Sequence, residues 1–133
     1  MKKAVVYWSG TGNTEAMAKA VAVGAGAPLI SAADFGAAQA AELDGIAFGC
    51  PAMGAEALEE SEFEPMFESV KGSLAGKRVA LFGSYGWGDG DWMQLWEDDC
   101  RAAGISLVCP SVICQGEPDA QALAKCKALG AAL

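Results

Sequence analysis

Short apolar runs alternate along this chain with longer segments in which apolar residues recur every three or four positions. Residues 4–8, 46–50 and 79–83 are almost continuously apolar. A run that is apolar on both faces is typical of a parallel strand covered by helices. Residues 29–30 and 105–108 are shorter apolar runs that predict two weaker strands.

The segments between these runs have the period of amphipathic helices. Their apolar stripes are formed by Met17, Val21 and Ala25; by Met66, Phe67, Val70 and Leu74; by Trp92, Met93, Trp96, Cys100 and Ala103; and by Ala122, Leu123, Cys126, Leu129 and Leu133. Pro65 suits the first turn of the second helix, Gly104 ends the third, and Asp119 is a capping residue for the last. The Ala-rich residues 35–43 predict one more short helix.

A strand followed by a helix, repeated about five times, predicts a doubly wound α/β domain with right-handed crossovers. The last strand is interrupted at Pro110 and can resume at 112–114. No internal repeat, linker or low-complexity tract divides the 133 residues, so we expect a single domain over 1–133.

Composition agrees with a compact domain, at 53% hydrophobic and 20% charged residues. No apolar run approaches the ~18 residues of a membrane span. The charged start Met1-Lys2-Lys3 leads into an apolar run, but Ser9-Gly10 cuts it short. We therefore expect no signal peptide and a cytoplasmic location, with no membrane partner.

Cysteine and histidine usage argues against metal chemistry. The five cysteines form no C-x-x-C pair, so neither an iron–sulfur cluster nor a zinc site is expected. The chain has no histidine, which removes the commonest metal ligand and general base. We predict no metal site and no catalytic residue.

The net charge of −8 is unevenly placed. Its two acidic clusters are Glu56, Glu59, Glu60, Glu62, Glu64 and Glu68, and Asp89, Asp91, Glu97, Asp98 and Asp99. Nucleic acid is not an expected partner, because phosphate contacts require cationic side chains. The clusters are either a solubilising surface or a docking face for a basic partner.

The first predicted strand leads into the loop Ser9-Gly10-Thr11-Gly12-Asn13-Thr14 and then a helix. The loop lacks the Gly-Lys-Ser/Thr of a Walker A loop, and Glu15 replaces the third glycine of G-x-G-x-x-G. Hydroxyls, small residues and a helix N-terminus without a nearby cation predict a site for a terminal phosphate.

Two further loops accompany this one. Gly49-Cys50-Pro51-Ala52-Met53-Gly54-Ala55-Glu56 follows the third predicted strand, and Phe82-Gly83-Ser84-Tyr85-Gly86-Trp87-Gly88-Asp89-Gly90 follows the fourth. The three loops together closely resemble those of short-chain flavodoxins of anaerobic bacteria. The resemblance implies a three-layer sandwich with a five-stranded parallel sheet in the order 2-1-3-4-5. Ligands of such sheets lie beyond the carboxyl ends of the strands, a rule for which flavodoxin itself is a standard example.

The resemblance also implies a function. It is that of a low-potential one-electron carrier with non-covalently bound FMN, which shuttles between semiquinone and hydroquinone and turns over no substrate of its own. The implied partners are redox enzymes with basic docking surfaces, such as ferredoxin- or flavodoxin-linked oxidoreductases, and the implied state is a monomer.

The same resemblance implies which residues contact FMN. They are Ser9, Thr11, Gly12, Asn13, Thr14, Pro51, Ala52, Met53, Gly54, Ala55, Glu56, Ser84, Tyr85, Gly86, Trp87 and Gly88. Trp87 would cover the outer face of the flavin, Met53 the inner face, and Glu56 would accept from the flavin N3–H. The peptide between Gly54 and Ala55 would turn with the redox state, which a glycine permits.

The roles of three residues are left open. Trp8 can either pack at the end of the strand or contact the flavin chain. Pro51 and Ala55 stand where polar side chains could have contributed to FMN binding. An FMN-dependent NAD(P)H quinone or nitro reductase of the same fold is the alternative. A receiver-like signalling domain is a second alternative, but it needs acidic residues where this chain has Trp8-Ser9 and Cys50-Pro51, which argues against that class.

Overall fold

The computed structural model describes residues 1–54 and 56–133. Its strands are β1 (Lys3–Tyr7), β2 (Leu29–Ser31), β3 (Gly45–Gly49), β4 (Arg78–Tyr85) and β5 (Val112–Gln115). Its α-helices are α1 (Asn13–Ala25), α2 (Ala37–Ala41), α3 (Phe63–Lys71), α4 (Asp91–Ala102) and α5 (Ala120–Ala132). The five strands pair in parallel in the order β2-β1-β3-β4-β5, so the predicted fold class and strand order are confirmed.

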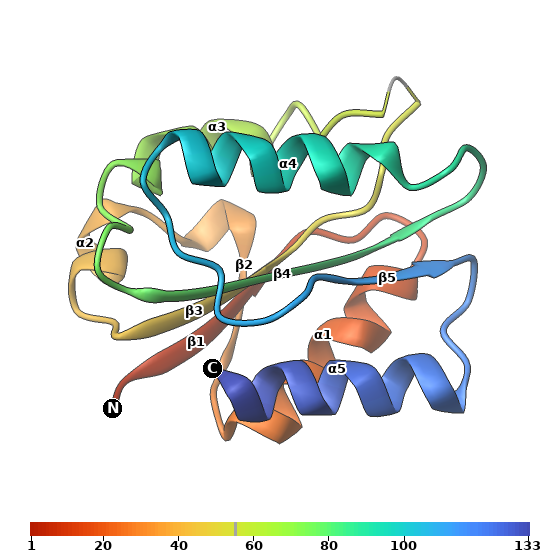
Figure 1. The fold of residues 1–133 in the computed structure, drawn as a ribbon, viewed down its shortest axis with the longest axis horizontal. Helices are drawn as coiled ribbons and strands as arrows, with labels where there is room; N and C mark the ends of the chain where they lie inside the picture. Colours follow the sequence, from red (N-terminus) through yellow and green to blue (C-terminus); the bar gives the residue numbers. More distant parts are fainter. Residues whose placement is uncertain (55) are drawn as a thin grey trace.

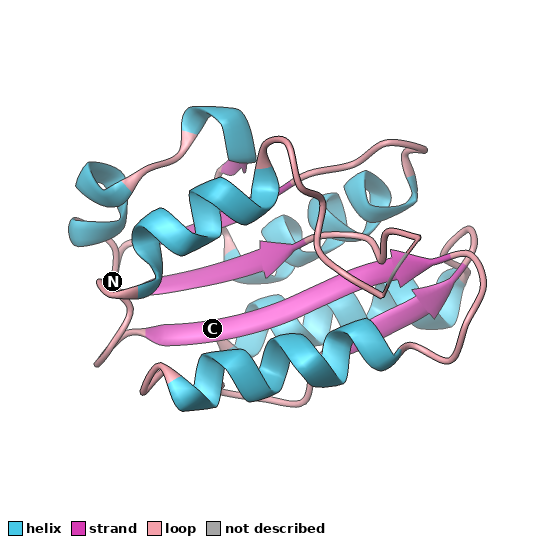
Figure 2. Cartoon of the chain, turned by 90° about the horizontal axis from the view of Figure 1, so that it is seen from above, coloured by secondary structure: helices cyan, strands magenta, loops and turns pink. Residues whose placement is uncertain are grey.

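Helices cover both faces of the sheet, and two apolar cores separate them from it. Helices α2, α3 and α4 lie on one face, and α1 and α5 lie on the other (Figures 1 and 2). Phe48 of β3 packs toward the first group and lies 5.2 Å from Phe67 of α3, ring centre to ring centre. Met17 of α1 belongs to the second core. Each core strand thus buries side chains on both faces, as its uninterrupted apolar run predicts.

Glycines allow α1 and α5 to pack closely. A Cβ at Gly130 would collide with the backbone carbonyl of Val21, and one at Gly24 would collide with that of Lys127. The backbone atoms could not move away without separating the helices, so neither position has room for a side chain. This contact holds the phosphate-loop helix α1 against the C-terminal helix.

Two predicted elements differ from the observed ones. Residues 105–108 form no strand, because Leu107 makes only one bridge, to Val79, and the true strand β5 begins at Val112. Pro110 has no N–H to donate, and the chain leaves the β4 edge beside it. Residues 35–43 form α2 only in part, after a 3₁₀ turn at Ala32–Asp34.

The capping prediction for the last helix is confirmed, since the Asp119 carboxylate accepts from the Ala122 N–H at 2.8 Å. Among the described residues, no helix is both long and apolar enough to cross a membrane.

Candidate functional site

The three predicted loops meet at the carboxyl ends of β1, β3 and β4. These strands are neighbours in the sheet, and the chain order reverses between β1 and β3. Two hollows of about 480 and 210 Å³ lie there, and both are lined by Trp8, Gly10 and Thr11. The smaller hollow is also lined by Asn13, Pro51, Ala52, Met53, Ser84, Tyr85 and Gly86. Residues from all three loops therefore line the smaller hollow, which shares Trp8, Gly10 and Thr11 with the larger one.

The loop between β1 and α1 presents backbone N–H groups. The Ser9 hydroxyl oxygen accepts from the N–H groups of Gly12 (3.1 Å) and Glu15 (3.2 Å), which holds the loop closed. Gly12 precedes α1 with φ of 97°, in the left-handed region that suits glycine. In the part of the chain that the structure describes, the N–H groups of Gly10, Thr11 and Thr14 have no acceptor. Free donors at a helix N-terminus suit a phosphate group.

Thr14 is placed differently from the other hydroxyls of this loop. Its side chain is 1% exposed, and its hydroxyl oxygen lies 2.7 Å from that of Ser84, which is 4% exposed. The Ser84 N–H also donates to the Thr14 hydroxyl oxygen at 3.3 Å. The Thr14 hydroxyl therefore joins the first turn of α1 to the end of β4. Only the backbone N–H of Thr14 is left to contact a ligand at the loop.

The loop after β3 is a small, self-bonded turn. The Met53 N–H donates to the Ala57 carbonyl, and the Glu56 N–H donates to the Met53 carbonyl, both at 2.9 Å. Glu56 has φ of 53°, an uncommon conformation for a residue with a side chain. Nothing lies within 4 Å of a Cβ built on Gly54. Ala55, which was predicted to contact the cofactor, lies outside the described residues.

The Glu56 carboxylate connects this turn to the loop after β4. Its Oε2 accepts from the Trp92 N–H at 2.7 Å, in the first turn of α4. Its Oε1 lies where a Cβ of Gly88 would be, so Gly88 leaves room for the carboxylate. One carboxylate oxygen is thus held by α4, while the other faces the loop that carries Trp87.

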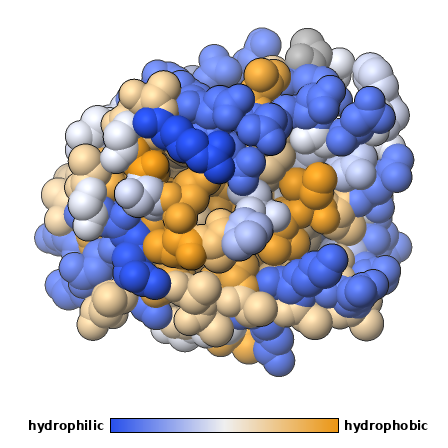
Figure 3. Space-filling model, viewed as in Figure 1, coloured by the Kyte–Doolittle hydropathy of each residue, from blue (hydrophilic) through white to orange (hydrophobic). Residues whose placement is uncertain are grey.

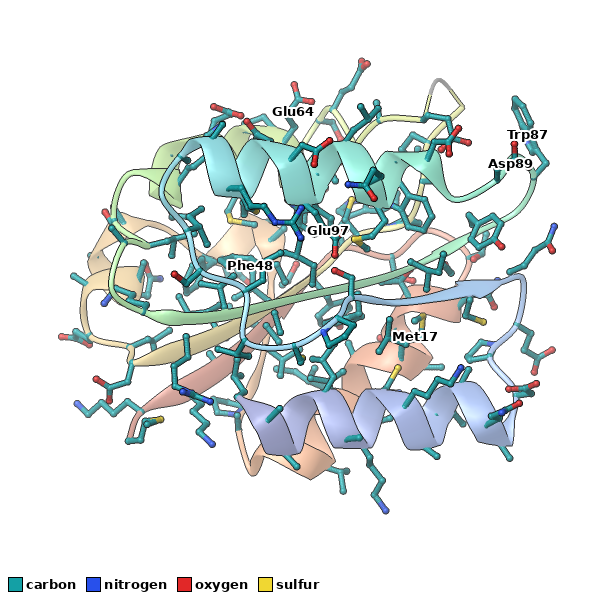
Figure 4. All side chains as sticks on the ribbon, viewed as in Figure 1. Met17, Phe48, Glu64, Trp87, Asp89 and Glu97 are labelled. Atoms are coloured by element: carbon teal, nitrogen blue, oxygen red, sulfur yellow. The ribbon has the colours of Figure 1, made fainter. Side chains whose placement is uncertain are left out.

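Two large apolar side chains remain exposed at this end of the molecule. Met53 is 38% exposed and Trp87 is 73% exposed. Trp87 projects beyond the end of the sheet beside Asp89 (Figure 4). Trp8 packs against the core and also lines both hollows, so its packing role is confirmed, and its contact with the flavin chain stays a prediction. Exposed apolar side chains beside a depression are suited to cover a flat ligand.

Sequence reasoning missed part of the lining. Gly10 lines both hollows, and its place in the predicted loop was the available signal. Ser31 and Glu62 line the larger hollow from β2 and from the turn before α3. No local pattern marks them, since only the folding of the sheet brings them beside the first loop.

Another hollow, of about 450 Å³, lies between β5 and α5 and includes Val112, Ile113 and Leu129. It contributes to the apolar surface between α4 and α5 in Figure 3. It includes no residue of the three loops, so it is separate from the site.

Metal and thiol chemistry find no support in the residues described. No group of three or more histidine, cysteine, aspartate or glutamate side chains among them could hold a metal ion. Burial raises the pKa of Cys50, Cys100 and Cys126 to about 12, which keeps these thiols protonated.

The two ends of the sheet differ in charge. Residues 4–18, 50–70 and 79–100, which include the three loops, contain no lysine or arginine. Lys2, Lys3, Lys77 and Arg78 lie at or beside the amino ends of β1 and β4. The site end is therefore acidic and the opposite end is basic.

The two acidic clusters do not form one surface. Glu59 is 5% exposed. Lys71 pairs with Glu68 at 2.9 Å and with Asp99 at 3.0 Å, where α3 and α4 end. The Ser111 hydroxyl donates to Glu97 at 2.6 Å. Of the exposed carboxylates in the two clusters, Glu62 lines the larger hollow, Asp89 follows Trp87 in the loop before α4, and Asp91 begins α4.

The chain combines a doubly wound parallel sheet with a loop at a helix N-terminus that contains no lysine or arginine. A hollow with exposed apolar side chains beside it lies where the strand order reverses. These features are those of a nucleotide-binding α/β protein. Comparison with known proteins narrows this class. The family model described as Flavodoxin matches residues 5–130. A flavodoxin of Clostridium beijerinckii is 48% identical over 120 residues, which cover 86% of this chain and 87% of that protein. A flavodoxin of Megasphaera elsdenii is 42% identical over 133 residues, covering 96% and 95%.

Solved structures agree. The solution structure of two-electron reduced Megasphaera elsdenii flavodoxin superposes with a TM-score of 0.88 at 43% identity, covering 98% of this chain and 96% of that one. A flavodoxin from the domain Archaea superposes with a TM-score of 0.86 at 33% identity, covering 98% and 94%. The chain belongs to the flavodoxin family. Its function is electron transfer, and its cofactor is FMN.

The residues at the site fit this cofactor. Among the described residues, the N–H groups of Gly10, Thr11 and Thr14 have no acceptor, and a phosphate beside the start of α1 would accept from them. Because residues 4–18 contain no lysine or arginine, these N–H groups and the nearby hydroxyls would be the phosphate ligands. Met53 and Trp87 are exposed apolar side chains that would cover a ring system.

Proposed function

We propose that this chain is a low-potential one-electron carrier that binds one FMN at the three loops and converts no substrate of its own. The observation that carries the proposal is the convergence of these loops on the smaller hollow, which Thr11, Met53 and Tyr85 line from one loop each. Bound FMN supplies the redox chemistry, and the protein supplies binding, orientation and electrostatics.

Each loop has a separate task in this proposal. The N–H groups of Gly10, Thr11 and Thr14 and the hydroxyls of Ser9 and Thr11 bind the terminal phosphate. Met53, with Pro51 and Ala52, covers one face of the ring, and Trp87 covers the other. Ser84 and Tyr85 border the sugar-alcohol chain, since both line the smaller hollow. The backbone of Gly86 and Gly88 and the free oxygen of Glu56 face the polar edge of the ring.

Acidic side chains lower the potential in this arrangement. A carboxylate ~10 Å away, in an effective dielectric constant of ~20, opposes an added electron by about 1.7 kcal/mol, or roughly 70 mV for one electron. Salt reduces this effect, since ~10 Å is about one Debye length. Glu62, Asp89 and Asp91 are exposed carboxylates beside the site residues, and the three loops contain no lysine or arginine to offset them.

The same carboxylates form the proposed docking face. Their partner is a redox enzyme with a basic surface, which complementary charge would orient toward the exposed Trp87. The opposite end of the molecule, with Lys2, Lys3, Lys77 and Arg78, would point away from such a partner. The carrier would act as a monomer. Five free cysteines suit a reducing compartment, so we infer a cytoplasmic location.

A reductase of the same fold would need a second site for a hydride donor beside the flavin. Trp87 stacked on the exposed face would block this approach, which favours a carrier over a reductase. Steady-state assays with NADH or NADPH and a quinone distinguish the two, because a carrier gives no turnover without an added reductase.

Titration of the apoprotein tests the site. We expect one FMN per chain, with riboflavin bound at least 100-fold more weakly, since riboflavin lacks the phosphate. Equal affinity for the two ligands would contradict the phosphate assignment. Stepwise reduction of the FMN complex, monitored by absorption, is expected to show two well-separated one-electron potentials.

A further inference from the structure

Glu59 is the one charged side chain that is buried among the residues described, at 5% exposure. It lies four residues before α3, and it lines neither of the hollows at the site. Its carboxylate nevertheless has a full set of hydrogen-bond donors. Oε1 accepts from the N–H groups of Glu62 (2.8 Å) and Phe63 (2.9 Å). Oε2 accepts from the N–H (2.8 Å) and the hydroxyl of Ser61.

Three of these donors are backbone N–H groups just before and at the start of α3, which have no acceptor within the helix. A buried carboxylate that accepts from them satisfies groups that a helix leaves without partners, and it favours the positive end of the helix dipole. The carboxylate therefore fixes residue 59 against the start of α3. The Glu59 carbonyl adds to this contact, because it accepts from the Glu64 N–H at 2.8 Å.

The backbone N–H of Glu59 points the other way, to the end of β3. It donates to Cys50 Sγ at 3.4 Å. Cys50 is itself held on two sides, since its N–H donates to the Phe82 carbonyl at 3.2 Å and its carbonyl accepts from Trp92 Nε1 at 3.3 Å. Cys50 is fully buried. The two ends of the loop after β3 are thus joined through the buried sulfur of a residue whose backbone is hydrogen-bonded to β4 and α4.

The turn at Met53–Ala57 lies inside this closed loop, with Gly54 exposed at its tip. The turn has its own hydrogen bonds and the Glu56 contact to Trp92. Its N-terminal side is held to β4, because the Ala52 N–H donates to the Ser84 carbonyl at 2.9 Å. Its C-terminal side runs through Leu58, which packs against the core, to the anchor at Glu59. Loss of the Glu59 anchor would loosen the C-terminal side of the turn, although no ligand contact had been removed.

We propose that Glu59 is a positioning residue for FMN: it closes the loop between Cys50 and α3, and so sets where Met53 and Glu56 meet the flavin. Residues at the tip of the loop contact FMN, and Glu59 acts by positioning them. The inference rests on the proposed function for its ligand, but the order of the loop in the apoprotein is independent of that ligand.

The test compares Glu59→Gln with Glu60→Gln. Both variants lose one negative charge in the same loop, but Glu60 is exposed and belongs to neither the site nor the cap. Three quantities are measured: amide hydrogen exchange of Met53 and Glu56 in the apoprotein, the dissociation constant for FMN, and both one-electron potentials. Glu59→Gln is expected to speed exchange at both amides at least tenfold and to weaken FMN binding about tenfold. Its potentials are expected to shift beyond those of Glu60→Gln.

A purely structural cap would behave differently. It would lower the melting temperature of Glu59→Gln while exchange, FMN affinity and potentials matched those of Glu60→Gln, and this result would overturn the proposal. If Glu59→Gln does not fold, Cys50→Ala and Cys50→Ser take its place. The first removes the acceptor of the Glu59 N–H and should speed exchange, and the second restores an acceptor and should slow it again. Equal exchange in these two variants would also overturn the proposal.

The two hypotheses fail separately. If the unmodified protein binds no FMN, the proposed function is wrong, while the exchange rates in the apoprotein still decide whether Glu59 orders the loop. If the protein binds FMN and the Glu59 and Glu60 variants are alike, only the positioning role is wrong.

Discussion

The side-chain oxygens of Thr14 and Ser84 lie 2.7 Å apart, although 70 residues separate them along the chain. Both side chains are buried, so the contact joins the first turn of α1 to the last residues of β4 without water. It aligns the phosphate loop with the loop that carries Trp87.

Replacement of Thr14 by valine keeps the shape of the side chain and removes its hydroxyl. Ser84 would then be buried without its partner, which costs about 1–3 kcal/mol. We expect the free energy of unfolding of the apoprotein, measured with urea, to fall by this amount. The exposed Thr11 gives the matched control: Thr11→Val should change stability by less than about 0.5 kcal/mol and should weaken FMN binding. Equal stability losses in the two variants would contradict the distinction between these hydroxyls.

Electron transfer with a basic redox partner should slow steeply as salt rises, because the exposed carboxylates at the site end attract it. The rate is measured from roughly 20 to 500 mM salt, over which the Debye length shortens about fivefold. Asp89→Asn and Asp91→Asn should reduce the slope. Glu42→Gln, an exposed carboxylate beside the amino end of β3, should not. A rate that does not depend on salt would leave the carboxylates as a solubilising surface.

Gly54 has room for a side chain, since nothing lies within 4 Å of the Cβ position. Gly54→Thr should therefore leave the affinity for oxidised FMN nearly unchanged. If reduction turns the peptide after residue 54 and requires a positive φ at residue 54, a β-branched side chain there would cost the turned form about 1–2 kcal/mol. The first one-electron potential should then fall by roughly 40–90 mV, at 59 mV per tenfold change. Unchanged potentials in this variant would show that the peptide does not turn.

Acid should destabilise the protein partly through Glu59. Burial by itself would raise the pKa of this carboxyl, but hydrogen bonds from Ser61, Phe63 and Glu62 outweigh it and lower the pKa from 4.5 to about 2. A carboxyl whose pKa is lower in the folded state stabilises the fold above its unfolded pKa and loses this contribution as the pH falls toward 2. Urea unfolding between pH 6 and 2 should therefore show a shallower loss of stability in Glu59→Gln than in the unmodified protein, with Glu60→Gln as the control. Parallel curves for all three proteins would exclude this contribution.

The sequence by itself determined the elements that depend on local pattern. Continuous apolar runs marked β1, β3 and β4, because a strand covered on both faces buries every side chain. Gly12 and the hydroxyls around it marked the phosphate loop, because a positive φ and free N–H groups are properties of a few consecutive residues. Asp119 was recognisable as a cap for the same reason. The resemblance of the three loops then implied the strand order, which the structure confirms.

Only the tertiary structure decided how distant segments use these parts. In the sequence Glu59 belongs to a run of apparently solvated carboxylates, yet the fold buries it under α3 and next to Cys50. Thr14 resembles its neighbours in the loop, but the packing of α1 on β4 turns it toward Ser84. Spacing along a chain shows which residues share a face of one element. It does not show which side chains meet across two elements, because that depends on how the helices pack on the sheet.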